Sequence, residues 1–149
     1  MHVTQSYDEF VAAIYNEKRI VNLFVEVLNK EEIALTHGQI DELDLLVSEK
    51  AQLVEQLEEL EKNREQYLLS FGCTPDKNGM HSWLSKQEDM ELQAVWNELI
   101  EMAKIAKQVN QVNGQMISTQ QLYNQRAYLS LQSAAGNISL YGPKGQAFT

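Results

Sequence analysis

The stretch LDLLVSEKAQLVEQLEELEKNREQYLLSF, residues 43–71, decides the fold of this chain. Large side chains recur in it at alternating spacings of three and four residues, which is typical of an α-helix with one buried face. The repeat is kept without a slip at Leu43, Leu46, Lys50, Leu53, Leu57, Leu60, Arg64, Tyr67 and Phe71. The stems of Lys50 and Arg64 can pack along this face while their charges reach outward. The pattern predicts one helix over about residues 40–71, ended by Gly72.

The segments on both sides of this helix carry the same period. Apolar positions repeat over residues 5–36, and Gly38 follows them where a helix C-terminus favours glycine. Residues 72–81, GCTPDKNGMH, are rich in turn-forming residues and predict a loop. Ser85 and Glu88 then have the spacing of a capping box. A third helix is expected over about residues 83–132.

The sequence therefore predicts an all-α fold: an antiparallel helical hairpin, a longer third helix, and an irregular C-terminal tail. The three helices should form an elongated, coiled-coil-like bundle over residues 1–132, followed by a flexible tail at 133–149. At 1.5 Å per residue the third helix would reach about 75 Å, against roughly 48 Å for the hairpin. Gly114 lies inside this third helix, where glycine costs about 1 kcal/mol relative to alanine.

Charge is distributed unevenly along the chain. The net charge of −9 argues against binding to nucleic acid or to an anionic membrane. Residues 1–72 carry fifteen Asp and Glu against six Lys and Arg, whereas residues 73–149 carry six of each. After Glu101 the sequence has no carboxylate side chain. The two ends of the protein are thus suited to different surroundings.

The sequence carries no recognisable catalytic or metal-binding motif. His2, His37 and His81 are scattered, and Cys73 is the single cysteine, so a metal site, a cofactor or an internal disulfide is not expected. No local motif marks a nucleophile, and we do not expect an enzyme. The N-terminus lacks the basic start and apolar stretch of a signal peptide, and no segment is apolar for long enough to span a bilayer. We expect the protein to stay in the cytoplasm.

The carboxylate-free part of the third helix needs a partner. Its apolar residues lie on more than one face, so the helical hairpin cannot cover them all. Met102 and Met116 suit an irregular partner surface, because methionine side chains adapt to many shapes. Two explanations stay open at this point: a helix of a client protein covers these residues, or a second copy of the chain does.

Three stretches resemble the FlgN family of flagellar export chaperones. HGQIDELDLLVSEKAQLVEQLEELEKNR, residues 37–64, is similar to the second-helix region of that family. VNQVNGQMI, residues 109–117, resembles its Asn-x-x-Asn-Gly signature, although Met116-Ile117-Ser118 replaces the more usual Leu-Leu-Glu. LYGPKGQ, residues 140–146, resembles its C-terminal Tyr-Gly-x-x-Gly-Gln motif. The likeness covers about residues 5–147.

This resemblance implies a function and two sets of site residues. It implies a cytoplasmic chaperone that binds the C-terminal helical segments of the hook–filament junction proteins FlgK and FlgL, prevents their premature assembly and delivers them to the export gate. The expected client-binding residues are Met102, Val109, Val112, Asn113, Met116, Ile117 and Tyr123. The expected export-gate docking residues are Tyr141, Gly142, Gly145 and Gln146. A homodimer is expected when client is absent, and the alternative is a self-associating scaffold without a dedicated client.

Overall fold

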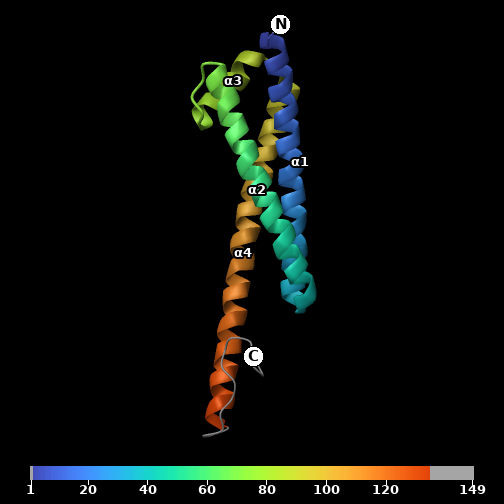
Figure 1. Cartoon of the computed structure of the whole chain (residues 1–149), viewed down its shortest axis with the longest axis vertical. Helices are drawn as coiled ribbons and strands as arrows, with labels where there is room; N and C mark the ends of the chain where they lie inside the picture. The colour runs from blue at the N-terminus through green and yellow to red at the C-terminus, as the bar shows by residue number, and fades with distance from the viewer. Residues whose placement is uncertain (1, 135–149) are drawn as a thin grey trace. The chain divides into compact units, whose positions relative to one another are not determined.

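The structure is a computed structural model that describes residues 2–134, and the helices in it confirm the all-α fold (Figure 1). Helix α1 covers His2–His37, α2 covers Ile40–Ser70, α3 covers Lys77–Gln87 and α4 covers Met90–Ala134. The chain forms two compact units, Met1–Gln111 and Val112–Thr149, and α4 contributes to both. Within the described residues, no helix is both long and apolar enough to cross a membrane.

Two glycines end the first two helices, as the sequence predicts. Gly38 has φ +67° and Gly72 has φ +78°, a backbone conformation that side chains with a Cβ rarely adopt. The residue after each glycine donates its N–H to the carbonyl five positions back: Gln39 to Ala34 and Cys73 to Leu68, both at 2.9 Å. These bonds satisfy carbonyl groups that the last helical turn leaves open. Each helix therefore stops where the glycine stands.

Helices α1 and α2 lie side by side and antiparallel, and two ion pairs cross between them (Figure 1). Arg64 on α2 pairs with the buried Glu17 on α1, and Lys50 Nζ lies 3.3 Å from Oε1 of the buried Glu31. The prediction that Lys50 and Arg64 direct their charges outward is wrong. The two Glu residues lie fourteen residues apart on α1, and their two partners lie fourteen residues apart on α2. Both ion pairs therefore form together in only one antiparallel register of the two helices. A buried charge without its partner is costly, and the pairs therefore disfavour a slipped register.

Glu17 makes the stability of this unit depend on pH. Burial raises its pKa, although Arg64 opposes the shift. The folded chain thus binds this proton more tightly than the unfolded chain does. The stability that this proton contributes is complete below the ordinary pKa of 4.5 and is lost as pH rises through the folded value.

Replacing Glu17 with Gln should remove this dependence. We expect the variant to gain stability relative to the original chain as pH rises from about 4 to 7, because only the original chain must bury a charge as it deprotonates. Urea denaturation at a series of pH values measures the difference. Glu55→Gln, at an exposed α2 position, controls for the loss of one charge. If the Gln variant instead lost stability relative to the original chain as pH rises, the effect of Arg64 on the pKa of Glu17 would outweigh that of burial.

Aromatic residues form the centre of the larger core. Phe10 on α1 is fully buried, and the centroid of its ring lies 4.5 Å from that of Trp83, 5.0 Å from Tyr67 and 6.0 Å from Phe71. Buried Met80, Leu84, Leu92 and Val95 belong to the same cluster. The cluster joins α1, α2, α3 and the start of α4. It therefore holds the end of the hairpin at which the chain turns into α3.

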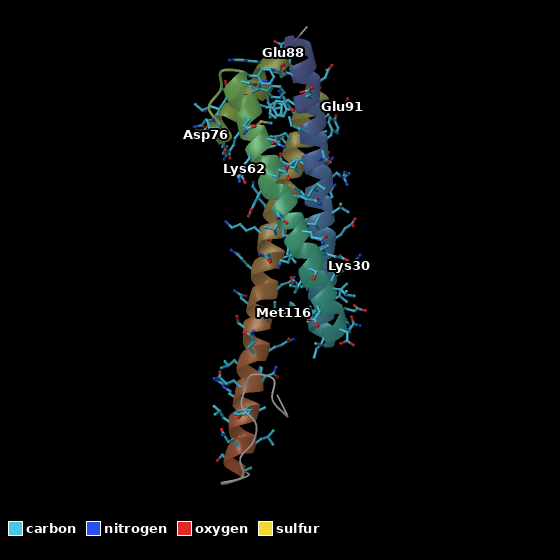
Figure 2. The ribbon with its side chains drawn as sticks, in the orientation of Figure 1. Lys30, Lys62, Asp76, Glu88, Glu91 and Met116 are labelled. Carbon is cyan, nitrogen blue, oxygen red and sulfur yellow. The ribbon has the colours of Figure 1, made fainter. Side chains whose placement is uncertain are left out.

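Helix α3 corrects the prediction of a loop at 72–81 followed by one helix from 83. The helix begins after Asp76, whose Oδ1 accepts the N–H of Gly79 at 2.9 Å (Figure 2). The expected capping box at Ser85 and Glu88 is wrong, because Ser85 lies inside α3 and donates to the carbonyl of His81. The helix buries Met80, Trp83 and Leu84. Its start could not be predicted from the sequence pattern, because residues 74–79 are rich in turn-forming residues.

The chain breaks again between α3 and α4. Glu88 has φ +52°, a left-handed conformation that is uncommon for a residue other than glycine, and it ends α3 (Figure 2). Asp89 Oδ1 then accepts the N–H of Leu92 at 3.1 Å, which is the hydrogen bond of a helix N-cap. Helix α4 is continuous for 45 residues, through Gly114, and is longer than α2 as predicted.

The first half of α4 packs on α1. Val25 and Leu28 of α1 form a small core with Ala106 of α4. Polar contacts join the same two helices, since Lys18 pairs with Glu98 and the Tyr15 hydroxyl lies 3.4 Å from Glu91 Oε1. In residues 1–111, α1 is therefore the helix against which both α2 and α4 pack.

Candidate partner-binding surface

The expected client-binding residues fall into two groups. Met102 and Val109 are half-buried and pack against the small core of Val25, Leu28 and Ala106. Part of each side chain thus already has a partner inside the chain. Their expected contact with a client is limited to the surface that this packing leaves open.

The second group lies in the unit that begins at Val112. Val112 is 43% exposed and Tyr123 is 65% exposed, whereas Met116 and Ile117 are half-buried and Asn113 is buried. Figure 2 labels Met116 on α4. Val112, Met116 and Tyr123 follow one another at spacings of four and seven residues, which places them on one side of the helix. Asn113 is the exception, because its side chain is enclosed.

Three further apolar residues belong to this surface although the sequence analysis did not assign them. Leu122, Leu129 and Leu131 are each about half exposed. Leu122 and Leu129 lie seven residues apart, and this spacing is the signal that could have found them. Exposed apolar residues on several sides of one helix are unusual for a surface helix, which makes these residues a candidate binding surface. We call Val112, Met116, Tyr123, Leu122, Leu129 and Leu131 the α4 apolar surface.

The electrostatics of the α4 apolar surface differ from those of the hairpin. The chain has no Asp or Glu after Glu101, and Arg126 is the one charged residue in 112–134. The polar residues in this segment are mostly Gln, Asn, Ser and Thr. An approaching helix therefore meets amides and apolar side chains rather than a negative field.

The remaining predictions concern the export-gate residues, metal binding and the cysteine. The export-gate residues Tyr141, Gly142, Gly145 and Gln146 lie outside the described residues. Among residues 2–134, no three His, Cys, Asp or Glu side chains come together in a way that could hold a metal ion. The single cysteine, Cys73, is buried beside the aromatic core.

Comparison with known proteins gives one match. The family model described as FlgN protein matches residues 1–148, which is nearly the whole chain. No curated protein and no solved structure matches the chain.

Proposed function

The chain belongs to the FlgN family of flagellar export chaperones, and we propose that it binds the C-terminal helical segments of the junction proteins FlgK and FlgL in the cytoplasm. By covering these segments it prevents their premature assembly, and it then delivers them to the export gate. The observation that carries this proposal is the α4 apolar surface, in which five of the six side chains are exposed and Met116 is half-buried.

A client helix is a suitable occupant of this surface. Segments that are disordered before assembly commonly fold as amphipathic helices when their apolar side meets an apolar surface. Tyr123 offers a large, rigid contact at low entropic cost, which is typical of residues that dominate binding energy. Met116 adapts to side chains of different shape, so related clients can share one surface.

The C-terminal tail has a separate role in this proposal. The resemblance of residues 140–146 to the family's C-terminal motif supports docking of Tyr141, Gly142, Gly145 and Gln146 on the cytosolic domain of the export gate. One aromatic residue in a small pocket can anchor such a contact without disturbing a client on α4.

The triple substitution Val112→Gln, Met116→Gln and Tyr123→Gln tests the client site. Gln keeps helix propensity close to that of the original side chains but removes the apolar contact. We expect the affinity for a FlgK C-terminal segment to fall by about a hundredfold, since each lost apolar contact costs on the order of 1 kcal/mol. Isothermal titration calorimetry measures the change, and circular dichroism checks that helix content is kept.

A matched control carries Ile40→Gln and Leu45→Gln. Both residues are large, apolar and well exposed, but they lie on α2. Their loss should leave client affinity unchanged. If both variants weakened client binding equally, or if the α4 variant did not weaken it, the α4 apolar surface would not be the client-binding site.

A chain that ends at Gln132 separates the two roles. It should still bind client and lose its contact with the export gate. Loss of client binding on this truncation would instead place client recognition in the tail. Light scattering distinguishes the competing scaffold: a dimer that client does not dissociate would favour self-association through the same residues.

A further inference from the structure

A second apolar surface lies in the unit of residues 1–111, and none of the residues assigned to the client lines it. A cavity of about 570 Å³ opens between α2 and α4, with α1 as its floor and the start of α3 at one end. Leu57 of α2 and Trp96, Ile100 and Ala103 of α4 line it, and all four are half-buried. These side chains are covered less than the core but more than ordinary surface residues.

The walls of the cavity are long enough to contact two turns of a helix. Its lining runs from residue 57 to 65 on α2 and from 96 to 103 on α4. At 1.5 Å per residue each wall is about 10–12 Å long, or two helical turns. Helices α2 and α4 both pack on α1 and leave this gap between them, so a further helix would complete a four-helix arrangement.

The charged residues around the cavity define which helix would fit. Arg64 is already engaged, because it pairs with Glu17 and its guanidinium carbon lies 5.2 Å from the centroid of Trp96. The remaining charged groups on the lining are the carboxylates of Glu61, Glu65 and Asp76 and the amine of Lys77. The rim is therefore acidic around an apolar centre.

We propose that this cavity is a docking site for a cationic amphipathic helix of a partner protein. The apolar stripe of that helix covers Leu57, Trp96 and Ile100, and its Lys or Arg side chains reach Glu61 and Glu65 on the α2 rim. The Glu17–Arg64 pair closes the floor, so that the partner meets no uncompensated buried charge. This surface is separate from the α4 apolar surface and goes beyond the proposed client site.

A designed peptide is the probe. A blocked peptide of about 18 residues, made of Leu at helical spacing on one face and Lys on the other, is long enough to fold on binding. A second peptide with Glu in place of Lys serves as its counterpart. The full chain should bind the Lys peptide and not the Glu peptide in calorimetry at physiological salt.

Two double variants locate the peptide. Glu61→Lys with Glu65→Lys reverses the charge of the rim and should weaken binding by about tenfold or more, because each contact changes from attraction to repulsion. Glu55→Lys with Glu59→Lys makes the same change in net charge, at the same spacing on α2, but outside the cavity lining. It should weaken binding by less than about threefold through the long-range field alone.

The client-site variant separates this inference from the proposed function. The chain with Val112→Gln, Met116→Gln and Tyr123→Gln should keep its affinity for the Lys peptide. The inference is overturned if the Lys peptide does not bind, if both charge variants weaken it equally, or if the client-site variant alone abolishes binding. FlgK binding at the α4 apolar surface is measured separately, with the FlgK C-terminal segment in place of the designed peptide.

Discussion

Phe10→Ala is expected to lower the free energy of unfolding by about 3–5 kcal/mol, which is the usual cost of removing a buried phenylalanine. The side chain is fully buried, and its ring lies among those of Tyr67, Phe71 and Trp83. The loss has two parts: the transfer of apolar surface from water, and the cavity that the neighbouring rings cannot fill. Contacts between α1, α2 and α3 are weakened together, because these rings come from all three helices.

Urea denaturation followed by circular dichroism measures this loss. Ile33→Ala is the matched control, since it also removes a large apolar side chain from α1 but at a position that is 55% exposed. It should change stability by less than about 1 kcal/mol. If the two variants were equally stable, the aromatic cluster would not be the main core of this unit.

Gly79→Ala has the second large effect, and its direction is the opposite of the usual one. Alanine in place of glycine inside a helix normally stabilises by about 1 kcal/mol. At Gly79, however, a Cβ would lie 1.7 Å from the carbonyl oxygen of Thr74, which is a backbone atom. The turn before α3 must move to admit it, and overpacking of this kind costs at least about 1–3 kcal/mol.

The hydrogen bonds at the start of α3 make this movement more costly. Asp76 accepts the Thr74 hydroxyl at 2.7 Å and the Gly79 N–H at 2.9 Å. The two hydrogen bonds hold the pKa of Asp76 below its ordinary value. Displacing Thr74 from Gly79 breaks this arrangement, which caps α3.

Gly114→Ala provides the comparison for Gly79→Ala. Nothing lies within 4 Å of a Cβ built at Gly114, and the residue is inside α4. We expect this variant to gain about 1 kcal/mol. Urea midpoints of the two variants should therefore move in opposite directions. Stabilisation by both substitutions would show that Thr74 yields without cost.

The helical hairpin could be predicted from the sequence because its signals are local. The three–four repeat from Leu43 to Phe71 fixes the buried face of α2, and Gly38 and Gly72 mark the ends of α1 and α2. A helix of this length needs only its own period and a residue that favours the left-handed conformation at its end. The FlgN resemblance, which the family match confirms, rested on motifs of the same local kind.

The candidate sites could be predicted only in part. The apolar residues after Val112 were visible as an excess that one helix face cannot hold. Which of them stay open was not visible: Tyr123 is exposed, Asn113 is enclosed, and Met102 and Val109 already pack against α1 residues. Exposure depends on neighbours far away in the sequence, so a single helical period cannot give it.

The sequence by itself determined the all-α class, the C-terminal ends of α1 and α2, and the excess of acidic residues in the first half of the chain. The tertiary structure alone decided that Glu17 and Glu31 are buried against Arg64 and Lys50, and that residues 77–87 form a separate helix. The physical reason is that burying an ion pair, or seating Trp83 beside Phe10, depends on contacts between distant segments. Such contacts can outweigh the turn propensity of Asn78 and Gly79. The local sequence pattern at these two residues predicts a loop.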